Sequence, residues 1–365
     1  MLTARRRQPT ARTVVGAHSP LPRWLRRALP PLVAVAVLVS LIVVVNPRLV
    51  GDAAARFNPV FAVPLVALAG LYYGLQGLRW HLLLRAVGVR QPLARSEAMN
   101  LAGQAVSATF PLGDLARALL ASRSSGAPFG TTAATVTVQE LSFTVCLVLM
   151  AAPGLVQLPG GVVWVAAAVT GVAAVVVILS VPRVFSGARR LVAATPVLRR
   201  LTVQVDTLQG DARRLLRSPE VLAGAVLDLA RAAVAATAVW VILLALHIGG
   251  LTWWAAALAL SVSYIGCALS LLPGGLGANE ASFVGILTVL GMPPAPAVGA
   301  AILASLWQSG SAVLGGLVAY AALRRSLRLS GLTGLLPAAS PSVAPTELAE
   351  AATVPVVDAL AKRAA

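Results

Sequence analysis

Polar and charged side chains interrupt the apolar stretches of this sequence at two places, and these residues are the best candidates for binding a polar ligand. The first set comprises Asn100, Pro111, Gly113, Asp114 and Arg117. The second set comprises Pro273, Gly274, Gly275, Gly277, Asn279 and Glu280. A charge among apolar residues is costly unless a partner or ligand neutralises it. Because a guanidinium group binds phosphate in a forked geometry, we expect Arg117 to bind an anionic headgroup.

Both sets contain the proline and glycine residues that break helices. A broken helix has free N–H and C=O groups, which survive among apolar residues only beside a wet cavity or a polar ligand. A helix that begins after Gly277 directs its positive end at the break. No strand precedes these glycines and no lysine follows them, so they do not form a nucleotide-binding loop. The two breaks resemble each other at a spacing of about 162 residues, and paired breaks of this kind indicate a transporter's binding site.

Further ionisable residues lie inside apolar stretches. Glu140 stands without a nearby basic residue, whereas Asp228 and Arg231 are three residues apart, as are Asp114 and Arg117. Residues at this spacing share a helix face, so either pair can form. We expect Asp228 and Arg231 to neutralise each other, whereas Asp114 and Arg117 are expected to act on a ligand. For Glu140 and Glu280 we expect contact with a cationic group, a proton-carrying role or pairing with Arg117. The aromatic residues Tyr72, Tyr73, Trp80, Trp253 and Trp254 are predicted to be interfacial anchors.

The composition excludes several classes of protein. With 58% hydrophobic and only 11% charged residues, the chain is too apolar for a soluble domain. Its net charge of +17 comes mainly from arginines clustered between apolar runs, which is typical of membrane topology and not of nucleic-acid binding. The three histidines and two cysteines show no metal-ligand spacing, so we expect no metal, no disulfide scaffold and no cofactor.

The apolar stretches predict an all-α integral membrane protein, because only helices satisfy the backbone of such segments in a bilayer. We expect about eight transmembrane helices, a re-entrant hairpin, a broken helix and a possible internal repeat. The expected spans are residues 29–46, 58–78, 128–152, 161–182, 220–247, 252–272, 276–291 and 294–322.

Arginine clusters predict the orientation, since cytoplasmic loops carry the excess of positive charge. They place the N-terminal arm (1–28) and the C-terminal tail (326–365) in the cytoplasm, together with the loop at 183–219 inside the transmembrane domain at 29–325. This requires residues 276–291 to cross the membrane and residues 97–122 to form a hairpin. The proline-rich tail is expected to be disordered.

The central loop carries an amphipathic pattern. The apolar residues at steps of three and four, which lie on one helical face, are Leu198, Leu201, Val205, Leu208, Ala212 and Leu215. Such a helix either lies on anionic headgroups or packs against the transmembrane bundle, and the pattern fits both arrangements.

In order and spacing, the sequence resembles the lysylphosphatidylglycerol synthase transmembrane-region family of flippase-like proteins. The resemblance rests on Arg79 and Trp80, on the Pro111 to Arg117 segment, on Glu140 and on the Pro273 to Glu280 segment. It implies a bacterial inner-membrane protein that moves or handles lipids, with Arg79 among the substrate-binding residues. Family members usually carry charged residues where Leu141, Thr144 and Asn279 stand here, so the charge pairing is expected to differ.

These observations predict a membrane flippase or transporter that handles an anionic phospholipid or a lipid-linked substrate. Members that synthesise aminoacylated lipid carry a large soluble catalytic domain, so we expect this chain not to be an enzyme. Two alternatives stay open. The first is a non-transporting accessory subunit of a cell-envelope lipid or glycan enzyme, and the second is a membrane glycosyltransferase or acyltransferase.

Overall fold

The computed structural model describes residues 51–107, 113–181, 184–190, 202–270 and 277–327, apart from residues 52, 54, 157, 159, 188 and 189. The predicted span at 29–46, the arm at 1–28 and residues 328–365 lie outside the described residues. Four predicted site residues lie outside them as well: Pro111, Pro273, Gly274 and Gly275.

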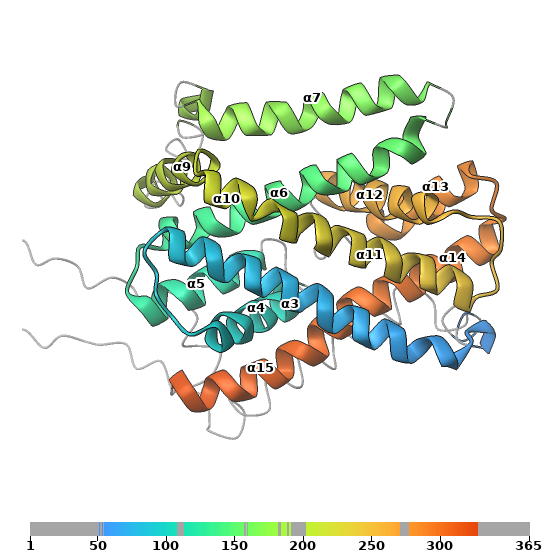
Figure 1. Cartoon of the computed structure of the whole chain (residues 1–365), viewed down its shortest axis with the longest axis horizontal. Helices are drawn as coiled ribbons and strands as arrows, with labels where there is room; N and C mark the ends of the chain where they lie inside the picture. Colours follow the sequence, from blue (N-terminus) through green and yellow to red (C-terminus); the bar gives the residue numbers. More distant parts are fainter. Residues whose placement is uncertain are drawn as a thin grey trace, which may run out of the picture.

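The regular elements of the described residues are all helices, and no β-strand occurs among them (Figure 1). In chain order the elements are η1 (Pro59–Phe61), α3 (Ala62–Ala86), α4 (Leu93–Ser107), α5 (Asp114–Ser125), α6 (Phe129–Val156), α7 (Gly161–Ser180), α9 (Thr202–Leu216), α10 (Pro219–Ala223), α11 (Ala225–Ala245), α12 (Trp253–Ser270), α13 (Ala278–Val289), α14 (Pro294–Ser305), the π-helical turn η4 (Leu306–Gly310) and α15 (Ser311–Leu327).

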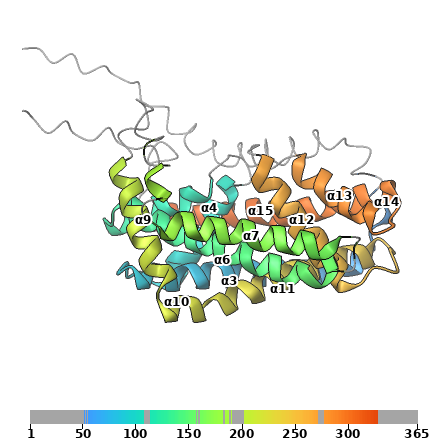
Figure 2. The same ribbon diagram turned by 90° about the horizontal axis from the view of Figure 1, so that it is seen from above.

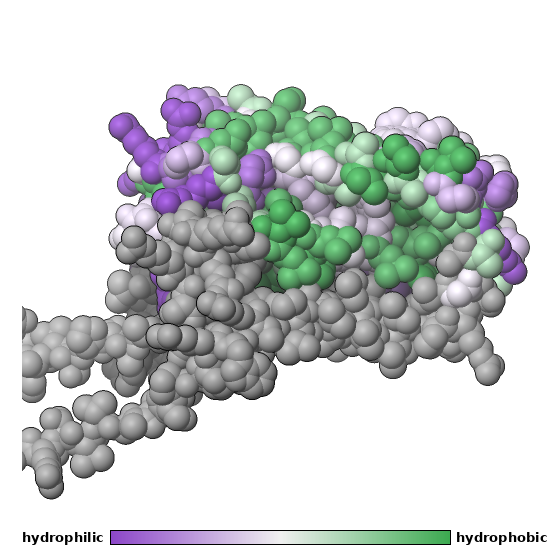
Figure 3. All heavy atoms as spheres, turned by 90° about the horizontal axis from the view of Figure 1, so that it is seen from below, coloured by the Kyte–Doolittle hydropathy of each residue, from purple (hydrophilic) through white to green (hydrophobic). Residues whose placement is uncertain are grey.

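Five helical segments are long and apolar enough to cross a membrane. They are Pro59–Ala86, Phe129–Val156, Gly161–Ile178, Pro219–Ala245 and Pro294–Ala319. These segments run lengthwise through the molecule in Figures 1 and 2. Figure 3 shows apolar side chains along the middle of the visible face and hydrophilic ones at its two ends. This distribution suits a bilayer core flanked by headgroup regions, and it confirms the predicted all-α membrane fold.

Two helical hairpins complete the bundle. Helices α4 and α5 pack together at the end where α9 lies, and α12 and α13 pack together at the opposite end (Figure 1). The 97–122 region therefore forms a hairpin, as predicted. The prediction that 276–291 crosses the membrane is wrong, because α13 has only 12 residues. Such a helix is about 18 Å long, against a hydrocarbon core of about 30 Å.

Helix α12 follows α6 from the C-terminal end of α6 to its middle. A side chain at Gly154 would contact Leu258, Ser261 donates to the carbonyl of Leu147 at 2.9 Å, and the rings of Phe143 and Tyr264 are 5.5 Å apart. The expected spans 252–272 and 276–291 thus form one hairpin that enters and returns. Replacing two expected crossings by one hairpin changes the number of crossings by two, so the direction of the following helices is unchanged. Helix α15 accordingly ends at the end of the bundle where α9 lies (Figure 1).

The chain contains an inverted structural repeat. Helices α3, α4, α5 and α6 form a long helix, a hairpin and a second long helix, and α11, α12, α13 and α14 repeat this order. The first residues of corresponding helices are 160 to 165 residues apart. Figure 1 shows that α3 and α11 run in opposite directions. The similarity seen in the sequence at about 162 residues therefore has a structural counterpart.

Three of the predicted interfacial anchors lie in the protein core instead. Tyr72 and Tyr73 are 2% and 6% exposed, and Trp80 is completely buried. The indole N–H of Trp80 donates to Thr135 at 3.0 Å. Their polar atoms find partners on neighbouring helices, so these residues need no contact with the interface. Trp254, in contrast, is 43% exposed.

Helix α9 packs against the bundle. Ala212 and Leu215 are buried in a cluster with Leu83 of α3 and with Ala134 and Val138 of α6. This contact decides between the two arrangements that the sequence allowed, because the apolar face of α9 is covered by protein.

Candidate functional site

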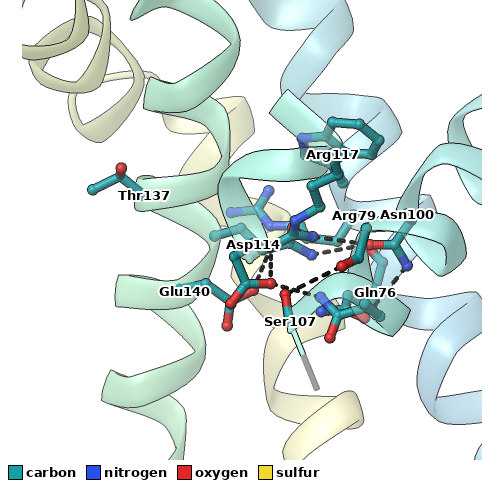
Figure 4. A network of polar contacts seen from close by, with 12 residues as sticks. Gln76, Arg79, Asn100, Ser107, Asp114, Arg117, Thr137 and Glu140 are labelled. Atoms are coloured by element: carbon teal, nitrogen blue, oxygen red, sulfur yellow. Dashed lines mark hydrogen bonds and ion pairs between the residues drawn. The ribbon is translucent and has the colours of Figure 1, made fainter. Parts of the chain in front are cut away.

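The centre of the site is Arg117, in the first turn of α5, where the α4–α5 hairpin meets the middle of α6 (Figure 4). Its side chain is completely buried. Its Nη1 donates to Asn100 of α4 at 2.9 Å and to Gln139 of α6 at 2.8 Å, and its Nη2 donates to Glu140 at 2.5 Å. Three polar side chains from two helices therefore fix this guanidinium, which is how a buried charge is kept satisfied.

The predicted pair of Asp114 and Arg117 forms, but it is not the main contact of either residue. The Asp114 carboxylate is 3.8 Å from Arg117 Nη2 and accepts a hydrogen bond from Gln104 at 2.8 Å. Its side chain is 41% exposed, and that of Glu140 is 32% exposed. The two carboxylates thus have an accessible side, whereas the arginine lies behind them.

A second arginine, Arg231 of α11, reaches the same carboxylate. Its Nη1 is 3.7 Å from Glu140 and its Nη2 donates to the hydroxyl of Tyr72 at 2.7 Å. The guanidinium lies over the ring of Phe143, 3.9 Å from the centroid. Aromatic faces and a phenol oxygen stabilise a cation that has little access to water.

The predicted pairing of Asp228 with Arg231 is wrong. Asp228 instead accepts from Arg79 of α3 at 3.0 Å, and both side chains are buried. Arg79 also donates to the carbonyl of Val221 at 2.8 Å, and a side chain at Gly224 would collide with it. Sharing a helix face allows a pair to form but does not require it, and here the neighbouring helix offers each residue a better partner.

Hydrogen bonds continue from Arg231 of the second repeat through Tyr72 of the first to Tyr264 and Gln308. The hydroxyl of Tyr72 is 3.0 Å from that of Tyr264 in α12, and Gln308 in η4 donates to Tyr264 at 2.5 Å. Sequence reasoning assigned Tyr72 to the membrane interface and did not select Tyr264 or Gln308. Gln308 had the clearest signal, since it is an amide side chain within a long apolar stretch.

The second predicted set behaves differently from the first. Glu280, in the first turn of α13, accepts from the N–H of Gly277 at 2.8 Å and from Ser305 of α14 at 2.6 Å. Asn279 donates to Ser305 at 3.3 Å. Within the described part of the chain Glu280 forms no ion pair, so it does not join Arg117.

The contacts of Glu280 and Arg117 nevertheless correspond in the inverted repeat. Each residue lies in the first turn of the second hairpin helix, and each contacts the helix that follows, at Ser305 and Glu140 respectively. A chain of polar contacts joins the two hairpins: Arg117 contacts Glu140, Glu140 contacts Arg231, and Arg231 and Tyr264 of α12 both contact Tyr72. The polar groups of the two hairpins are therefore connected.

The described residues contain no group of three or more His, Cys, Asp or Glu side chains that would hold a metal ion. Neither Cys146 nor Cys267 forms a disulfide.

Long apolar helices, two hairpins of opposite direction and buried charges between them define a multi-pass membrane protein built on an inverted repeat. Residues 32–330 match the family described as the lysylphosphatidylglycerol synthase TM region, and the chain belongs to this family. A comparison with curated proteins gives no match.

Proposed function

We propose that the protein is a lipid flippase or transporter that handles an anionic phospholipid or a lipid-linked anionic substrate. The observation that carries this proposal is the pair of hairpins, which enter from opposite ends and bring polar side chains to the middle of the bundle. Transporters built on inverted repeats place their substrate sites at such breaks, and alternate access by moving one half against the other.

The contacts of Arg117 suggest how an anionic headgroup is bound. Arg117 is buried behind Glu140, and Glu140 is partly exposed. A phosphate that reaches the guanidinium must therefore replace Glu140 as its partner. This exchange releases Glu140 to Arg231, 3.7 Å away, so that both charges stay neutralised. Neutralisation during the exchange matters because an unpaired buried charge is strongly unfavourable.

We also propose that the end of the bundle with α9 faces the cytoplasm of a bacterial inner membrane. Arg213, Arg214 and Arg217 gather at that end, where Ala212 and Leu215 of α9 pack with Leu83 near the C-terminal end of the span Pro59–Ala86. An excess of arginine in short loops marks the cytoplasmic side.

Reconstituted vesicles test the transport proposal. Purified protein in vesicles with headgroup-labelled phosphatidylglycerol should move label between the leaflets, and Arg117→Ala and Glu280→Gln should each slow this movement at least tenfold. Arg214→Gln is the matched control, because this arginine is 77% exposed and lies away from the site.

Equal rates in wild type, Arg117→Ala and protein-free vesicles, across several anionic lipids, would contradict the proposal. Chemical conversion of the labelled lipid without its movement would favour a membrane enzyme instead.

A further inference from the structure

A basic pocket opens where α3 ends and the chain turns into α4. It has a volume of about 510 Å³ and is lined by His81, Arg85, Arg90 and Gln91. The side chains of Arg85 and Arg90 are exposed, and neither forms an ion pair with a carboxylate among the described residues. The pocket therefore carries two guanidinium groups without a counter-charge.

The wall of this pocket is held in place by a buried serine. Ser96 of α4 is completely buried, and its hydroxyl is 2.9 Å from His81 Nδ1 and 2.8 Å from Gln91 Nε2. The intervening turn is closed by a 2.9 Å hydrogen bond from Val89 to the carbonyl of Leu84. Gly88 adopts φ of 84° within it, a conformation that favours glycine. The two arginines thus project from a fixed frame.

An apolar stripe on α3 leads to the pocket. Leu71, Leu75, Leu78 and Leu82 recur at helical spacing, and Arg85 follows one turn after Leu82 on the same face. Leu71 is 51% exposed and Leu82 is 40% exposed, while Leu75 and Leu78 are partly exposed. Since α3 belongs to the span Pro59–Ala86, this stripe faces hydrocarbon and Arg85 lies at the headgroup boundary.

We propose that this pocket binds the phosphate headgroup of an anionic phospholipid from the leaflet at the α9 end, with its acyl chain along the leucine stripe. Unpaired arginines at the membrane boundary attract anionic headgroups, and the guanidinium fork matches phosphate geometry. The combination of charge and apolar stripe favours a lipid over a soluble phosphate. The proposal depends on the membrane position of α3 and is independent of whether the protein transports lipid.

Native mass spectrometry of the full chain in a neutral detergent tests this site. The protein is titrated with phosphatidylglycerol and, separately, with phosphatidylcholine of identical chains, so that the apolar contribution cancels. Wild type should retain one phosphatidylglycerol more tightly than phosphatidylcholine. The variant Arg85→Gln/Arg90→Gln should bind phosphatidylglycerol about tenfold more weakly and phosphatidylcholine unchanged.

Two arginine variants serve as controls. Arg56→Gln removes an exposed charge near the opposite end of α3, and Arg214→Gln removes one at the same end of the bundle. Both should retain the wild-type preference. The single variant Arg90→Gln, in the loop, should show part of the loss if the double variant does not fold.

Three results would overturn the proposal. They are equal binding of the two lipids by wild type, an unchanged preference in both the double and the single variant, and displacement of the lipid by inorganic phosphate at millimolar concentration. The last result would identify a site for free phosphate.

Discussion

The Glu140 carboxylate lies between two guanidinium groups, 2.5 Å from Arg117 Nη2 and 3.7 Å from Arg231 Nη1. Arg117 belongs to the hairpin of the first repeat, and Arg231 belongs to the first helix of the second. Glu140 is therefore an electrostatic link between the two halves of the fold.

Replacing Glu140 by Gln should destabilise the protein more than replacing an exposed carboxylate. The substitution leaves two buried guanidiniums without their shared negative charge, and breaking a buried pair typically costs about 3–5 kcal/mol. Because Glu140 is partly exposed, we expect a loss of unfolding free energy near the lower end of this range. Denaturant unfolding in detergent measures it, and Glu220→Gln on the exposed surface of α10 is the control. A loss no larger than that of the control would contradict the shared contact.

The partner of Asp228 can be established by double-mutant cycles. We expect coupling of about 1–3 kcal/mol between Arg79→Gln and Asp228→Asn, because these side chains are 3.0 Å apart and buried. Coupling between Asp228→Asn and Arg231→Gln should be smaller, because Arg231 contacts Tyr72 and Glu140. The free energies of unfolding of the single and double variants give both values. Stronger coupling of Asp228 to Arg231 than to Arg79 would refute this assignment.

The sequence predicted the positions of both breaks because glycine and proline act locally on the backbone. Glu140 and Arg117 could be selected as candidates because charge is rare in apolar helices, whereas Arg79 was selected from the family resemblance. The pairing of Glu140 with Arg117 was one of the alternatives that the sequence offered. The partner of Arg79 could not be selected, since Arg79 and Asp228 are 149 residues apart and meet only after α3 and α11 pack. Hydropathy also could not show that residues 276–291 lead the chain back to the side from which α12 enters. A half-helix and a short membrane span have the same composition.

A tight approach between the two helices of the first hairpin fixes Arg117. A side chain at Gly103 would place its Cβ 2.7 Å from Arg117 Cβ and 3.0 Å from the Arg117 backbone nitrogen. Gly103→Ala should therefore push α5 from α4 and destabilise the protein by about 1–3 kcal/mol. Gly74→Ala is the control, because Gly74 is an exposed residue of α3 with nothing within 4 Å of the added methyl group. That change should be neutral or stabilising by up to about 1 kcal/mol.

Measuring both stability and lipid transport of the two glycine variants distinguishes a role of Gly103 in packing α4 on α5 from a role in positioning Arg117. If Gly103→Ala is as stable as Gly74→Ala, the close approach of α4 and α5 is incorrect. If Gly103→Ala folds but slows lipid movement, the spacing of the hairpin helices controls the position of Arg117.

Glu97, in the second turn of α4, should make stability depend on pH. It lies outside the five long apolar segments, and its carboxylate packs over Gly77 of α3. Burial raises the pKa of the Glu97 carboxyl from 4.5 to about 7. The folded state therefore holds a proton that the unfolded state has already released, and keeping the ionised form buried costs free energy.

The sign of this effect follows from the direction of the shift. Below about pH 4.5 Glu97 is protonated in both states, and above about pH 7 it is ionised in both. Between these values the wild type should lose stability relative to Glu97→Gln as the pH rises, and the difference should then stay constant. Unfolding free energies across this range measure the difference, with Glu220→Gln on the exposed surface of α10 as the control. A wild type that gains stability relative to Glu97→Gln over this range would show that the folded protein favours the ionised carboxylate.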